Sequence, residues 1–201
     1  MQPENSLPVS SLFEGQPKSD EDMEFVFKAG TEAYKQIFQK TFLKELCEKS
    51  HIMQQLHEGL SLKDVLQLSD EQMEVLYAQA HRLLSSGNAK QAADAFLALI
   101  QVDYMEERFY FGFGVANQML GDFKLAARAY AAFLSFDAQN PDGYLRLGEC
   151  HLAVDELEHA REAIAFSITA AKEFHKEGYD DVIEYATKLL EAIDARLAAR
   201  S

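Results

Sequence analysis

The chain has 201 residues, a formal net charge of −14 and a hydrophobic content of 48%. This length and composition suffice for one packed domain, with or without an appendage. The negative charge argues against direct nucleic-acid binding, because phosphate contacts need a basic stripe, and against docking on an anionic membrane. The sequence contains no run of about 18 apolar residues, so membrane insertion is not expected.

The cysteine content and the N-terminus point to a cellular compartment. Cys47 and Cys150 are too few for a disulfide framework, and we expect both to be reduced. The first residues have neither the basic start nor the apolar core of a signal peptide. We therefore expect a soluble cytoplasmic protein.

The chain begins with a proline- and serine-rich stretch, residues 1–19, which we interpret as a flexible tail. Residues 20–68 form a predicted N-terminal helical segment with an apolar stripe at helical spacing. The stripe residues are Phe27, Tyr34, Ile37, Phe38 and Phe42. Two interpretations stay open: the stripe folds back on the following helices as a cap, or it pairs with a second copy of the chain to form a dimer.

Residues 69–171 contain a repeat with a period of 34 residues. Numbered from Met73, Glu107 and Pro141, the eighth and twentieth places are small, and the twenty-fourth is large. In repeat order these residues are Ala80, Gly114 and Gly148; Ala92, Ala126 and Ala160; Phe96, Tyr130 and Ile164. Small residues allow two helices to cross closely. A helix–turn–helix unit of this period is the tetratricopeptide signature.

The repeats predict helices over residues 71–84, 89–102, 106–120, 123–136, 141–154 and 157–171. Ser69 to Gln72 has the pattern of a capping box, and Pro141 suits a first helical turn. Gly87 and Gly121 are expected at the turns. Within residues 172–201, a last helix over 179–199 is expected to cap the array. The predicted fold is all-α, a short solenoid of three tetratricopeptide-like hairpins with N-terminal helices and a C-terminal capping helix.

No pattern in the sequence indicates catalysis. The six histidines lack the i, i+4 spacing of zinc ligands, no CxxC is present, and no phosphate-binding or GxSxG motif occurs. We therefore expect no catalytic residues, no metal site and no cofactor, and the protein is not expected to be an enzyme.

The first helices of the repeats are expected to line a concave wall. Its candidate partner-binding residues are Glu74, Tyr77, His81, Leu84, Arg108, Phe111, Val115, Gln118, Leu145, Glu149 and Leu152. The apolar middle and polar edges of this set suit an extended peptide with spaced hydrophobic anchors. The alternative is that the N-terminal segment merely covers Tyr77 and Phe111.

Three stretches resemble the class II chaperones of bacterial type III secretion. They read LSDEQMEVLYAQAHRLLSSGNAKQAADAFLALIQVD, RFYFGFGVANQMLGDFKLAARAYAAFLSFD and PDGYLRLGECHLAVDELEHAREAI. The resemblance covers residues 59–171. Carried over by position, the aromatic pocket of the first repeat falls on Tyr77, His81 and Leu84, the last two of which are usually aromatic in the family.

The resemblance implies a cytoplasmic virulence chaperone that binds hydrophobic translocator proteins through the concave groove and keeps them soluble before export. It also implies dimerisation through the N-terminal region. The alternatives are a generic tetratricopeptide scaffold between two cytoplasmic proteins, or a protein-binding co-regulator of gene expression.

Overall fold

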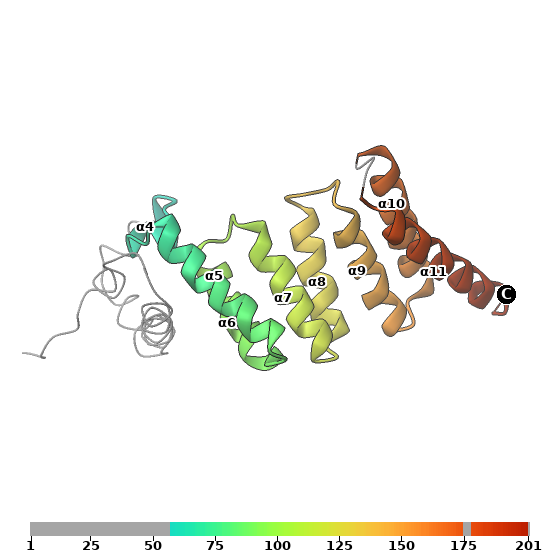
Figure 1. Ribbon diagram of the computed structural model, residues 1–201, viewed down its shortest axis with the longest axis horizontal. Coiled ribbons are helices and arrows are strands. Elements are labelled where there is room, and N and C mark those ends of the chain that lie inside the picture. Colours follow the sequence, from blue (N-terminus) through green and yellow to red (C-terminus); the bar gives the residue numbers. More distant parts are fainter. Residues whose placement is uncertain (1–56, 175–177, 201) are drawn as a thin grey trace, which may run out of the picture.

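The computed structural model describes residues 57–174 and 178–200, and this part of the chain consists of helices without strands. The helices are α4 (Leu62–Val65), α5 (Asp70–Ser85), α6 (Ala89–Val102), α7 (Glu107–Met119), α8 (Phe123–Leu134), α9 (Pro141–Ala153), α10 (Leu157–Glu173) and α11 (Asp180–Ala198). Figure 1 shows α5 to α11 side by side in chain order, and each helix packs mainly on its neighbours in sequence. The predicted all-α class and the three hairpins α5–α6, α7–α8 and α9–α10 are confirmed.

The repeat places found in the sequence form the interior of each hairpin. The fully buried members of the twentieth and twenty-fourth places are Ala92, Ala126, Ala160, Phe96, Tyr130 and Ile164. In the second hairpin Gly114 faces the ring of Tyr130, and in the third Gly148 faces Ile164. A small residue on the first helix therefore makes room for a large one on the second, as the period predicted.

The ends of the helices follow the predicted local signals. Ser69 Oγ accepts a hydrogen bond from the Gln72 N–H at 3.3 Å, and Gln72 Oε1 accepts one from the Ser69 N–H at 2.8 Å, which completes the capping box of α5. Pro141 is the first residue of α9. Gly87 and Gly121 have φ angles of 80° and 77°, the left-handed conformation that glycine adopts without strain.

The third turn places an aspartate where the first two have glycine. Asp155 lies 34 residues after Gly121 and shares the left-handed conformation, with a φ angle of 65°. Its carboxylate accepts hydrogen bonds from Arg196 Nη2 at 2.8 Å and Arg200 Nη2 at 2.7 Å. The turn of the third hairpin is thereby joined to the end of α11.

Helix α11 covers the last hairpin with one apolar face. Ala186 and Ile193 are buried in a cluster with Leu145, Leu157 and Ile164 of α9 and α10. Val182, Leu189, Leu190 and Leu197 pack around this cluster. The exposed residues of α11 include Arg196 and Asp194, so the helix closes the array with a polar outer face.

The predicted flexible tail and the candidate dimerisation stripe (Phe27, Tyr34, Ile37, Phe38 and Phe42) lie outside the described residues. Within residues 57–174 and 178–200, no helix is both long and apolar enough to cross a bilayer.

Candidate peptide-binding groove

A cavity of about 530 Å³ opens between α5 and α7 and extends to the loop between α8 and α9. Its lining residues are Tyr77, His81, Leu84, Glu107, Arg108, Phe111, Gly112, Val115, Phe133, Asp137, Asn140 and Asp142. A cleft of this size with an apolar middle and polar edges is typical of a ligand site. We call this cavity the groove.

The Tyr77 ring forms the wall of the groove on α5. It contacts Phe96 at 6.1 Å and Phe109 at 5.8 Å between ring centroids, which fixes the ring from below. The guanidinium carbon of Arg108 lies 4.7 Å from the centre of the same ring, a cation–π contact. Burial raises the pKa of the Tyr77 hydroxyl, so this side chain stays neutral and apolar in character.

Arg108 is held in place over Tyr77 by two carboxylates. Its Nε donates to Glu106 Oε1 at 2.7 Å, and its terminal nitrogens donate to Glu74 on α5. These hydrogen bonds raise the pKa of Arg108 above its ordinary value. Glu74 thus lies at the rim and orients Arg108, and the pair joins the first two repeats.

Phe111 lies in the centre of the groove. Its ring packs edge-on against Phe133 at 5.1 Å and against Tyr130 at 5.5 Å between centroids. Beside it, Gly112 leaves space for Phe96, because a Cβ at that position would lie 2.4 Å from the ring. The aromatic rings beneath the groove therefore come from three helices and are packed before any partner arrives.

The far rim of the groove is acidic. Glu107, Asp137 and Asp142 line it, and Arg108 is the one cation among the lining residues. Because Arg108 already pairs with Glu74 and Glu106, the negative charge of the rim is left largely uncompensated.

The structure brings six of the eleven predicted residues together in the groove. These are Tyr77, His81, Leu84, Arg108, Phe111 and Val115. Gln118 and Glu149 lie further along in a polar network: Gln118 Nε2 donates to Glu149 Oε2 at 3.1 Å, and Tyr130 donates to Gln118 Oε1 at 2.9 Å. This network links α7, α8 and α9.

Leu145, which we expected in the concave wall, does not line the groove. Leu145 is only 8% exposed and belongs to the core cluster of α9, α10 and α11, with Leu152 packed against it. The reason is the position of α11. The hydroxyl of its N-cap, Tyr179, donates to Asp142 Oδ2 at 3.3 Å, and the hydroxyl of Tyr185 donates to Glu149 Oε1 at 3.1 Å. The capping helix thus reaches the face of α9 that we expected to line the groove.

Several lining residues, on the first helix α7 and outside the first helices, were not predicted from the sequence. Phe133 belongs to α8, Asp137 and Asn140 to the following loop, and Glu107 and Gly112 to α7. The loop residues carry a usable signal: they precede Pro141, where the chain must return to the concave side to begin the next first helix.

Known proteins are similar to this chain in sequence and in fold. No family model matches the chain. A type III secretion complex from Aeromonas hydrophila superimposes with a TM-score of 0.68 and 27% identity, over 75% of this chain and 99% of that one. The translocator chaperone SycD of Yersinia enterocolitica gives a TM-score of 0.62 and 26% identity, over 65% of this chain and 89% of SycD. The chain is therefore similar in fold and sequence to the class II chaperones of type III secretion.

Two further similarities agree with this family. The low calcium response locus protein H of Yersinia pestis is 27% identical over 127 residues, which is 63% of this chain and 74% of that protein. PcrH, solved in complex with the chaperone binding region of PopD, has a TM-score of 0.61 and 27% identity, over 64% of this chain and 96% of PcrH.

Proposed function

We propose that this chain is a cytoplasmic chaperone that binds an extended segment of a hydrophobic type III secretion translocator in the groove. The observation that carries the proposal is the packed aromatic cleft around Phe111, in the fold of chaperones solved with translocator segments. SycD has been solved with a peptide of the translocator YopD, and PcrH with the chaperone binding regions of PopD and PopB. The chain acts by binding and not by catalysis.

The groove suits an extended segment better than a folded domain. Its volume of about 530 Å³ accommodates several apolar side chains, and its lining includes the polar side chains of Arg108, Asn140 and Asp142. Tyr77 and Phe111 are fixed by neighbouring rings, so binding orders few side chains of the chaperone and loses little entropy.

The charge of the chain serves the same function. A translocator carries membrane-seeking segments that aggregate when exposed. A partner with a net charge of −14 adds repulsion between complexes and keeps them dispersed. The groove holds only a short segment, so release before export breaks a limited set of contacts.

Site-specific crosslinking in the native bacterium tests this function. A photoreactive amino acid replaces His81 in the groove, and in a control variant it replaces Leu97, which is 42% exposed on α6 outside the groove. We expect the His81 position to crosslink to a secreted protein with hydrophobic segments, and the Leu97 position not to do so. Crosslinks from His81 only to a soluble, non-secreted protein would replace the chaperone function with a scaffolding one.

A further inference from the structure

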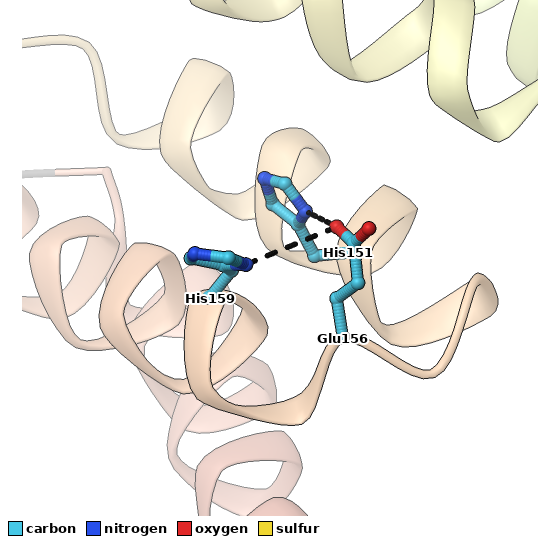
Figure 2. A group of neighbouring side chains, drawn as sticks. All are labelled: His151, Glu156 and His159. Carbon is cyan, nitrogen blue, oxygen red and sulfur yellow. Dashed lines mark hydrogen bonds and ion pairs between the residues drawn. The ribbon is translucent and has the colours of Figure 1, made fainter.

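Three potential metal ligands meet at the turn of the third hairpin, on a surface that does not line the groove. His151 lies in the last turn of α9, Glu156 is the N-cap of α10, and His159 lies in the first turn of α10. One donor atom from each lies within 4.8 Å of the other two. Figure 2 shows the three side chains converging from the two helices.

We propose that His151, Glu156 and His159 form a binding site for a divalent transition metal of the zinc class. Two imidazoles and one carboxylate are a ligand set that Zn²⁺ accepts, with solvent in the remaining position. No histidine ligand is predicted from the sequence, because no two histidines have the i, i+4 spacing of zinc ligands on one helix. These ligands come from two helices instead, and the turn brings them together.

The geometry is close to that of a coordinated ion. Glu156 Oε2 lies 2.7 Å from His151 Nδ1 and 3.9 Å from His159 Nδ1, and the two imidazole rings are 5.3 Å apart between centroids. Tetrahedral zinc with bonds of about 2.0–2.1 Å separates its donor atoms by roughly 3.3 Å. The distance from Glu156 Oε2 to His151 Nδ1 is thus about half an ångström shorter than the separation of donor atoms around zinc, and the distance to His159 Nδ1 is about half an ångström longer.

The side chains are free to make this adjustment. The exposed fractions are 22% for His151, 45% for Glu156 and 68% for His159, so rotation of the carboxylate and of the His159 ring meets solvent and not core. The backbone is set by Asp155, whose left-handed conformation reverses the chain directly before Glu156. The site is therefore largely formed in the folded chain.

The charges around the cluster are of both signs, and the net charge of the whole chain favours a cation. Glu162 lines the same surface hollow as both histidines and adds a second carboxylate nearby. Lys124 and Arg128 lie with His151 and Glu156 in an adjoining hollow and are the opposing charges. The whole chain carries a net charge of −14, which attracts cations at long range.

A bound ion would join the end of α9 to the start of α10. The same turn holds the arginines of α11 through Asp155, so metal binding adds a second connection at the end of the solenoid. Because the ion binds only when both helices are in place, it stabilises the folded chain by an amount that grows with the logarithm of the free metal concentration above its Kd.

Calorimetric titration of the full, untagged chain with ZnCl₂ tests the site, and cobalt absorption reports the coordination geometry. The variants are His159→Ala and Glu156→Gln, and the control is His57→Ala, an exposed histidine outside the cluster. Loss of an outer-sphere partner already weakens metal binding by roughly 10–100-fold, and loss of a direct ligand should weaken it at least as much.

The expected result is one equivalent of Zn²⁺ bound by the wild type and by His57→Ala, with binding weakened tenfold or more in both cluster variants. Zinc should raise the melting temperature of the wild type and not that of His159→Ala. Circular dichroism checks that the variants are folded. The proposal is overturned if the wild type binds no zinc, or if His159→Ala binds it as tightly as His57→Ala.

Discussion

Gly114 on α7 lies directly against the ring of Tyr130 on α8, and a Cβ added at Gly114 would lie 2.7 Å from Tyr130 Cε1. The next repeat has the same relationship 34 residues on, where a Cβ at Gly148 would lie 2.6 Å from Ile164 Cδ1. The close approach within the second and third hairpins therefore depends on the absence of a side chain at this place.

Replacing Gly114 by alanine should destabilise the chain, although alanine is the better helix former. Overpacking a filled core costs about 1–3 kcal/mol. The gain in helix propensity from glycine to alanine is at most about 1 kcal/mol, so the cost of overpacking should be the larger of the two. Urea denaturation of Gly114→Ala, Tyr130→Leu and the double variant measures the coupling. The double variant should lose less stability than the sum of the two single variants. Simple additivity would mean that the two residues do not compete for the same space.

The packing of the hairpins could be predicted because the residues that form it recur at a regular spacing in the sequence. A 34-residue spacing of small and large residues fixes which faces meet, and Ser69, Gly87 and Pro141 mark helix ends through local chemistry. The fate of Leu145 could not be predicted in this way. Its burial depends on where α11 packs after residues 172–179, and no repeat constrains that helix.

The metal cluster and the acidic rim escaped prediction for a related reason. The three side chains of the cluster converge because Asp155, directly before Glu156, takes a left-handed conformation. The glycines at the first two turns do not predict this conformation for an aspartate at the third. Likewise Asp137 reaches the groove through the loop between two hairpins. Contacts across a turn or a loop depend on backbone geometry that side-chain periodicity does not encode.

The Asp155 turn should hold the end of α11 through its charge. Asp155→Asn keeps a residue type that tolerates the left-handed conformation and removes the ion pairs to Arg196 and Arg200. We expect a lower melting temperature at low ionic strength and a difference from wild type that shrinks as salt is added. Asp155→Ala should melt lower still because alanine is strained at this φ. Equal melting temperatures for wild type and Asp155→Asn at low salt would show that the ion pairs contribute nothing.

The Cys150 thiol should be unreactive in the folded chain. Burial and, to a smaller extent, the neighbouring Glu149 carboxylate together raise the pKa of Cys150 to about 12. A thiol reagent acts on the thiolate, so in a Cys47→Ser background we expect labelling of Cys150 only on unfolding. Labelling of the native chain as fast as of the unfolded chain would contradict its burial.

The same shift predicts a dependence of stability on pH. A free thiol loses its proton near pH 8.5, so above that value the unfolded chain is deprotonated while folded Cys150 keeps its proton up to about pH 12. Stability should therefore fall as pH rises through this window, by up to about 1.4 kcal/mol per pH unit from this group. Urea melts at about pH 8 and about pH 10 should show a smaller loss for Cys150→Ala than for wild type. An identical loss in both would assign the effect to other groups.

The N-terminal stripe remains a candidate dimer interface outside the described residues. Replacing Phe38 and Phe42 by glutamate in the full chain puts charges on an apolar contact, which should shift a dimer to monomer. Light scattering of wild type and variant over a range of concentrations measures the mass. An unchanged mass with the fold intact would favour the alternative in which the stripe is a cap.

Phe111 is the residue on which the binding function should depend most. It lies at the centre of the groove, where a bound segment excludes water most completely, and central anchors commonly contribute about 2 kcal/mol or more. Truncating it to alanine also removes its contacts with Tyr130 and Phe133. Circular dichroism and a Phe111→Leu variant, which keeps an apolar side chain in place, therefore accompany the binding measurement.

The most direct test is fluorescence anisotropy of a fluorescein-labelled peptide that copies the segment crosslinked to position 81. We predict that Phe111→Ala raises its Kd about 30-fold at unchanged helicity, that Phe111→Leu has a smaller effect, and that Leu97→Ala, outside the groove, leaves the Kd as in wild type. If Phe111→Ala keeps both its helicity and the wild-type Kd, the groove is not the binding site. If it loses its helicity, Phe111 belongs to the core and not to the site.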